Sequence, residues 1–310
     1  MEESNGTLVG ILVIFGEVNM LDASVIIISK NERDNLKMTL DSLMNTENKR
    51  LMEIIVIDDG SDDGCSDFLH NPPYEEYVTL VKTPGLGTSN ARNLGASHAS
   101  GEILFFCDSH VQVPDGWLDH MIDFMKLMHA DLLAPAVASL TQPEAIGYGL
   151  TMNKNGDINW SNVKPDSPCY IPFVCSCFMA IRAAVFHDIG GFDSHYKIYG
   201  SEDAELSLKA WLFGYKAVLH PDIVIKHLFK ESYTYKFDWY HMNHNILWMA
   251  CTHYNATRLS KILKRISDDP DMKEVVEEVL SSGVWNQRNK YKNRRVHDDD
   301  WFFDTFHIPY

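Results

Sequence analysis

Residues 25–32 read Val-Ile-Ile-Ile-Ser-Lys-Asn-Glu, which is four β-branched residues followed by a polar break. An unbroken run of this kind is typical of a strand that is buried on both faces of a parallel sheet. Apolar residues then recur along one helix face, at Leu36, Leu40, Leu43 and Met44. A buried strand that leads straight into an amphipathic helix indicates the first unit of an α/β fold.

The same alternation continues along the chain. Strands are predicted at residues 54–57, 78–81 and 103–106, and a helix is predicted at residues 88–97. Strands that alternate with helices form right-handed βαβ units. Such units build a mainly parallel, Rossmann-like sheet, so the predicted fold class is α/β.

Polar clusters follow two of the predicted strands. Asp58-Asp59 comes after the second strand, and Asp108-Ser109-His110 comes after the fourth. Ligands of open α/β sheets bind beyond the carboxyl ends of the strands. A carboxylate and an imidazole two residues apart suit one divalent cation, Mn²⁺ in the first place and Mg²⁺ as the alternative. Taken alone, Asp-x-His is more typical of a capped turn with a solvated histidine than of a metal site.

The second part of the chain has a different pattern. Short strands are predicted around Ala217 and at residues 223–225, whereas apolar residues between 239 and 280 follow helical spacing. We therefore expect an α/β domain over residues 1–232 and a helical extension over residues 233–310. The aromatic side chains near the end are expected to be exposed; they are Trp301, Phe302, Phe303 and Phe306.

Composition excludes several kinds of partner. The chain has 43 acidic and 27 basic side chains and a formal charge of −16, so nucleic acid and anionic membranes would be repelled. The apolar residues 8–15 supply about half of the roughly 20 residues that a membrane span needs. We predict a short strand or a packed arm there, no membrane span and a cytoplasmic protein. The oligomeric state is left open.

The six cysteines do not form paired Cys-x-x-Cys arms. Buried free thiols in a reducing compartment are therefore the preferred interpretation. A zinc site built from Cys169, Cys175 and Cys177 is the weaker alternative.

Ordered blocks of the chain resemble GT-A glycosyltransferases of family 2. The blocks are residues 24–32, 57–61, 88–95, 101–110, 190–206 and 225–230. The spelling Asp-Ser-His, in place of the commoner Asp-x-Asp, is similar to the polypeptide N-acetylgalactosaminyltransferases. The resemblance implies a GT-A domain that binds a nucleotide-sugar, with the helical extension in an acceptor-binding or lid role.

The resemblance also implies a set of metal ligands. Asp108 and His110 match the first two ligands, and His227 matches the histidine that completes the metal site in the polypeptide-modifying family. The metal is expected to be Mn²⁺ or Mg²⁺, and the donor substrate a UDP-sugar.

Further residues match positions on the nucleotide-sugar side. Asp59 matches the acid that binds uracil, and Arg92 matches the arginine that faces the nucleotide and pyrophosphate. Tyr199 and Glu202 match residues that border the donor sugar, and Ser109 is placed beside the nucleotide. A carboxylate accepts the imide N–H of uracil, and an arginine forks onto phosphate oxygens, so the chemistry suits both roles.

One departure from the polypeptide-modifying family lies at the start of the helix that is predicted after residue 201. Glu202-Asp203 stands where that family has Glu-Asn, and Glu-Asp is similar to inverting members in which the Asp is the general base. An inverting transfer needs one carboxylate to take the acceptor's proton, and we expect Asp203 to do so. Retention, as in the polypeptide N-acetylgalactosaminyltransferases, is the alternative, and helix N-terminal electrostatics is the structural explanation of Asp203.

The expected activity is metal-dependent transfer of a hexose or N-acetylhexosamine from a UDP-sugar. A polypeptide side chain is the first choice of acceptor, and a saccharide is the second. The chain would not be an enzyme if it were a sugar-nucleotide-binding module, which keeps the fold but has no need of Asp203 or a full set of metal ligands.

Overall fold

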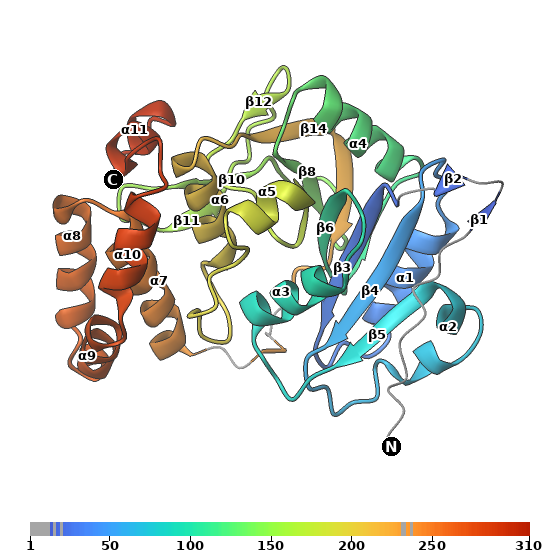
Figure 1. Ribbon diagram of the computed structural model, residues 1–310, viewed down its shortest axis with the longest axis horizontal. Coiled ribbons are helices and arrows are strands. Elements are labelled where there is room, and N and C mark those ends of the chain that lie inside the picture. The colour runs from blue at the N-terminus through green and yellow to red at the C-terminus, as the bar shows by residue number, and fades with distance from the viewer. Residues whose placement is uncertain (1–12, 15–16, 19–20, 231–233, 236–237) are drawn as a thin grey trace.

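The computed structural model describes residues 13–14, 17–18, 21–230, 234–235 and 238–310. Within these residues a ten-stranded sheet runs through the molecule, with helices packed on its faces (Figure 1). The strand order is β12-β14-β8-β13-β6-β3-β4-β5, with β7 paired to β14 and β9 to β8. The sheet therefore has one half built from the first strands of the chain and a second half built from later ones.

The first half is parallel throughout. It contains β3 (Ala23–Ser29), β4 (Met52–Asp58), β5 (Val78–Lys82) and β6 (Ile103–Asp108). Strand β3 pairs in parallel with both β4 and β6, and β4 pairs in parallel with β5. The predicted strands are confirmed. Because the chain adds strands on one side of β3 and then returns to the other side, the sheet has a topological switch point between β3 and β6.

Helices bury apolar residues against both faces of this half. Helices α1 (Asn35–Asn45) and α4 (Trp117–Leu127) share one hydrophobic cluster with the sheet. Helices α3 (Thr88–His98), α5 (Ala183–Asp188) and α6 (Glu202–Leu212) contribute to a second cluster. Alternate residues of β3 enter the two clusters, as expected for a strand covered on both sides.

The second half of the sheet is mixed. Strand β13 (Phe178–Arg182) lies antiparallel between β6 and β8 (Leu132–Ser139), and β14 (Ala217–His227) is parallel to β8. We predicted two short strands where β14 forms one, with a register shift between His220 and Val224. Pro221, which has no backbone N–H to donate to a ladder, lies in that interval and accounts for the break in the pattern.

Smaller elements complete this region. They are β7 (Val111–Gln112), β9 (Ile146–Gly147), the β10–β11 hairpin (Leu150–Met152 and Ile158–Trp160), β12 (Cys169–Tyr170), α2 (Tyr74–Tyr77) and a 3₁₀ turn at Asp67–His70.

The C-terminal part is helical, as predicted. Its elements are α7 (Trp239–His253), α8 (Ala256–Ser267), a 3₁₀ turn (Pro270–Met272), α9 (Lys273–Ser281), α10 (Val284–Lys292) and α11 (Asp299–Thr305). Apolar residues of these helices belong to the same cluster as α6. The expectation of an exposed aromatic tail is wrong, because α11 packs back onto that cluster: Phe302 and Phe303 are fully buried, and Trp301 and Phe306 are partly buried against it.

No helix in the described part of the chain is long and apolar enough to cross a membrane. Most of the apolar residues 8–15 lie outside the described residues. Val13–Ile14 forms β1, which pairs with β2 (Glu17–Val18).

Candidate active site

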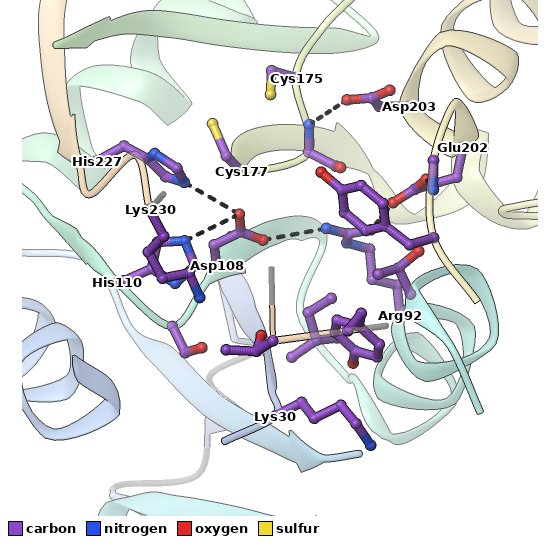
Figure 2. Close-up of a pocket in the computed structure, with 18 of the residues that line it drawn as sticks. Lys30, Arg92, Asp108, His110, Cys175, Cys177, Glu202, Asp203, His227 and Lys230 are labelled. Carbon is purple, nitrogen blue, oxygen red and sulfur yellow. Dashed lines mark hydrogen bonds and ion pairs between the residues drawn. The ribbon is translucent and has the colours of Figure 1, made fainter. Parts of the chain in front are cut away.

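A cavity of about 330 Å³ opens at the carboxyl ends of β3 and β6, which is the switch point of the parallel half. Seven segments of the described chain line it: the chain after β3, the start of α3, the end of β6, the end of β11, the loop before β13, the start of α6 and the chain after β14. Figure 2 shows side chains from these segments pointing toward one another. The cavity lies where open α/β sheets bind their ligands.

Asp108, His110 and His227 converge in this cavity. Each offers one ligand atom, and these atoms lie within 4.8 Å of one another. Asp108 ends β6 and His227 ends β14, and the pairing of His227 with Val111 of β7 brings the two strand ends together. The three predicted ligands therefore meet, although they come from distant parts of the sequence.

The distances suit one small divalent ion. Asp108 Oδ2 lies 3.3 Å from His227 Nε2 and 3.8 Å from His110 Nε2. Ligand atoms around an ion with bonds of about 2.1 Å lie roughly 3 Å apart, so small shifts would complete the coordination. One carboxylate and two imidazoles form a mixed donor set that fits Mn²⁺.

Electrostatics keep Asp108 ionised. Burial alone would raise the pKa of Asp108, but the hydrogen bond with His227 and the charges of His110 and Arg92 hold it well below its ordinary value. A carboxylate that stays ionised at all physiological pH values is ready to bind a cation.

Arg92 connects Asp108 at the end of β6 to Glu202 at the start of α6. Its Nη2 lies 3.3 Å from Asp108 Oδ1, and its Nη1 donates to Glu202 Oε1 at 2.8 Å. The side chain is buried, and burial is offset by Glu202 and Asp108, whose charges raise the pKa of Arg92. Arg92 lines the cavity, and two of its nitrogens are occupied in orienting carboxylates.

Glu202 and Asp203 open α6 on the other side of Asp108 from the two histidines (Figure 2). Glu202 Oε2 accepts from the backbone N–H of Gly200 at 2.8 Å. Asp203 Oδ1 accepts from the N–H of Ala204 at 2.8 Å, and both acids line the cavity. Burial, followed by repulsion from Glu202, raises the pKa of Asp203 to about 6.

The residues expected on the nucleotide side are not all in the cavity. Ser109 and Tyr199 line it, together with Arg92. Asp59 does not, because its buried carboxylate accepts the backbone N–H groups of Leu86 and Gly87. A buried acid at a strand end takes the nearest unpaired donors, which here belong to the loop that returns from β5.

Sequence reasoning missed Glu32 and Lys230 as site residues. Glu32 follows β3 and lies 3.2 Å from His110 Nδ1, and Lys230 follows β14 and donates to Glu32. The detectable signal was Glu32 itself, an acid beyond a buried strand at the same sheet edge as Asp108. Among the described residues no cysteine joins a metal-binding cluster, so the zinc alternative from Cys169, Cys175 and Cys177 is not supported.

The fold and the site together define a GT-A-type protein. The family described as glycosyl transferase family 2 matches residues 24–190, and the N-terminal domain of galactosyltransferase matches residues 160–234. Because the first match spans more than half of the chain, the protein belongs to glycosyl transferase family 2. The family resemblance drawn from the sequence is confirmed.

Relatives and a solved structure agree with this placement. Polypeptide N-acetylgalactosaminyltransferase 3 of Drosophila melanogaster is 28% identical over 243 residues, covering 69% of this chain and 36% of that protein. Putative inactive polypeptide N-acetylgalactosaminyltransferase 12 of the same species is 30% identical over 233 residues, covering 67% and 41%. The chain thus spans less than half the length of these curated relatives.

The fold is that of GalNAc-T7, which was crystallised with UDP, GalNAc and Mn²⁺. The two structures agree with a TM-score of 0.75 at 19% sequence identity, over 94% of this chain and 57% of the other. This likeness confirms the predicted GT-A fold class.

Proposed function

We propose that this protein is a metal-dependent glycosyltransferase that transfers a hexose or N-acetylhexosamine from a UDP-sugar. The observation that carries the proposal is the convergence of Asp108, His110 and His227 in a cavity that Glu202 and Asp203 also line. Its family membership and the UDP and Mn²⁺ of GalNAc-T7 support the same donor and metal.

The proposed metal centre uses the three converging side chains. When bound, Mn²⁺ or Mg²⁺ neutralises the charge that grows on the diphosphate leaving group. Arg92 holds Oδ1 of Asp108, which leaves Oδ2 directed at the two histidines. Lys30 adds positive charge to the cavity wall, which suits an anionic donor, whereas Glu32 balances the charge of Lys230.

Asp203 is the proposed general base. As the acceptor oxygen attacks the anomeric carbon, Asp203 takes the proton of that oxygen while the sugar–phosphate bond breaks and UDP leaves. A carboxylate with a pKa of about 6 is ionised at neutral pH, yet more basic than an ordinary aspartate. Attack from the face opposite the leaving group inverts the anomeric centre.

Retention is the competing stereochemical outcome. It is favoured by the similarity of this chain to polypeptide N-acetylgalactosaminyltransferases, because that resemblance implies a retaining transfer. NMR of the product from an α-linked donor decides between the two. A β-linked product supports Asp203 as the base, and an α-linked product rejects inversion and makes Asp203 a substrate contact.

A polypeptide side chain is the proposed acceptor. The relatives are named for polypeptide substrates, and the cavity has an apolar rim on which a peptide can pack. Trp160 and Phe229 form that rim, with ring centroids 6.2 Å apart in an edge-to-face arrangement. Peptides containing Ser, Thr or Cys should accept sugar, whereas exclusive transfer to oligosaccharides would favour the saccharide alternative.

A panel of nucleotide-sugars tests the activity itself. The protein is incubated with each donor and Mn²⁺, and the released nucleotide is measured with and without a chelator. We expect turnover with one UDP-sugar and none with GDP-sugars. Calorimetric binding of UDP-sugar without any turnover would identify a binding module. This outcome is worth testing because one relative is named as putatively inactive.

A further inference from the structure

Glu32 contacts His110, one of the three proposed ligands, without being a ligand itself. It is 3% exposed, and its Oε2 lies 3.2 Å from His110 Nδ1. Its Oε1 accepts from Lys230 Nζ at 2.5 Å, and Thr234 Oγ1 lies 3.5 Å from the same oxygen. Asn35 Nδ2 donates to Oε2 at 3.2 Å. One buried carboxylate thus joins the end of β3, the turn after β6 and the chain that follows β14.

The two metal-side histidines are supported differently. The nitrogens of His110 face opposite carboxylates, with Nδ1 toward Glu32 and Nε2 toward Asp108. His227 places Nε2 on Asp108, but its buried Nδ1 has no hydrogen-bond partner among the described side chains and backbone. Histidines that bind metals usually donate their second ring N–H to a carboxylate or carbonyl, which fixes the tautomer and the ring orientation.

We propose that Glu32 is the positioning residue of this metal centre. It accepts the Nδ1–H of His110, which leaves the lone pair of Nε2 directed at the ion. Through Lys230, it also ties the segment after His227 to the same point. The inference rests on the proposed metal-dependent function and adds a residue that no ligand motif identifies.

The test is calorimetric titration of the full chain with MnCl₂ alone. Glu32→Ala should weaken Mn²⁺ binding about 10- to 100-fold, the usual cost of losing such a partner. Glu32→Gln should lose less, because its amide oxygen still accepts from Nδ1. Imidazole ¹⁵N NMR of the Mg²⁺-loaded protein gives a second readout. The Nδ1–H form of His110 should dominate in the wild type and become mixed in Glu32→Ala.

Glu53 provides a matched control. It lies near the start of β4, at the opposite end of the parallel strands, and its Oε1 accepts from Ser24 Oγ and the Ser100 N–H. Glu53→Ala should leave Mn²⁺ affinity unchanged. Equal losses in Glu53→Ala and Glu32→Ala, or no loss in Glu32→Ala, would overturn the proposal. If Glu32→Ala does not fold, Glu32→Gln takes its place in the titration. A loss of Mn²⁺ affinity in Glu32→Gln then supports the proposal, and an affinity equal to that of the wild type overturns it.

Asp108→Asn in the same titration separates the two levels of inference. If Asp108→Asn binds Mn²⁺ like the wild type, the metal centre itself is misplaced and the proposed function fails. If Asp108→Asn loses binding while both Glu32 variants keep it, only the role of Glu32 is rejected.

Discussion

Asp203 should be essential for transfer but not for binding. Loss of a general base costs about 10²- to 10⁴-fold in rate, so Asp203→Asn should nearly abolish turnover. It should keep Mn²⁺ and UDP affinity, because the metal-site residues and Arg92 are unchanged. Steady-state kinetics and calorimetry on the same preparation check this. A variant that retains most of its activity would reduce Asp203 to a helix-terminus charge.

The raised pKa of Asp203 has a signature in both activity and stability. Because a base must be ionised, kcat/KM should fall as the pH drops through about 6. The folded state holds this proton more tightly than the unfolded chain, whose ordinary value is 3.8. The stability that this carboxyl contributes is therefore full below pH 3.8 and is lost as the pH rises through about 6.

It follows that, as the pH rises from 4 to 8, Asp203→Asn should become more stable relative to the wild type. Urea unfolding at pH 4 and at pH 8 measures this change. If the charge of Asp203 served mainly to stabilise the N-terminus of α6, the variant would instead lose stability at pH 8.

His227 completes the proposed metal centre. His227→Ala should weaken Mn²⁺ binding more than the loss of an outer partner does, which is typically about 10- to 100-fold. His220, earlier on the same strand and away from the cavity, is the control, and His220→Ala should bind Mn²⁺ normally. Unchanged Mn²⁺ affinity in His227→Ala would remove it from the ligand set.

The candidate site was only partly predictable from the sequence. Asp108, His110 and Arg92 could be predicted from the sequence, because strand ends and family blocks place them at one sheet edge. The position of Asp59 was not, since nothing in the sequence shows that the loop after β5 folds onto its carboxylate. Glu32 follows a buried strand at the same sheet edge, but its contact with His110 depends on a distance between two segments, which a linear pattern does not contain.

Helix α6 is anchored by a buried ionic cluster. Lys209 donates to Gly191 O at 2.7 Å and lies 3.1 Å from Glu205 Oε2, and Glu205 Oε1 lies 2.9 Å from His253 Nε2 of α7. All three side chains are buried. Removing one partner of a buried pair typically costs 3–5 kcal/mol, because it leaves a charge without compensation.

Lys209→Met should therefore lower the free energy of unfolding by about 3–5 kcal/mol, measured by denaturant titration. Lys37 is the control, since it also forms a pair four residues along a helix, with Asp41, but at the surface. Lys37→Met should unfold almost like the wild type. Equal effects of the two substitutions would show that burial is not what makes the α6 cluster important.

The elements themselves were predicted unevenly. The parallel strands were accessible because buried runs such as that of β3 have one dominant interpretation. Strand β14 was predicted as two strands because Pro221 interrupts its pattern. The residues before and after Pro221 both pair with β8, and this pairing makes them one strand. Phe302 and Phe303 follow an acidic run that suggests exposure, yet tertiary packing buries them.

The helices after residue 238 share one hydrophobic cluster with α6 and the sheet. We propose that they fold as one unit with the α/β part and do not act as an independent lid. The wild type should then unfold in a single transition, and a chain ending at residue 232 should show no cooperative unfolding. Calorimetry checks both. A truncated chain that melts cooperatively would support the boundary at residue 232 that the sequence suggested.

The wide separation of the proposed metal ligands along the chain has a consequence for biosynthesis. Asp108 and His110 leave the ribosome long before His227, which joins them only when β14 pairs with β7 and β8. A nascent chain that has formed only the parallel strands offers two ligands and holds a metal ion weakly. The free energy of metal binding also stabilises the folded chain, because the complete site exists only after folding. Tight metal binding is therefore expected only in a chain whose last strand, β14, has paired.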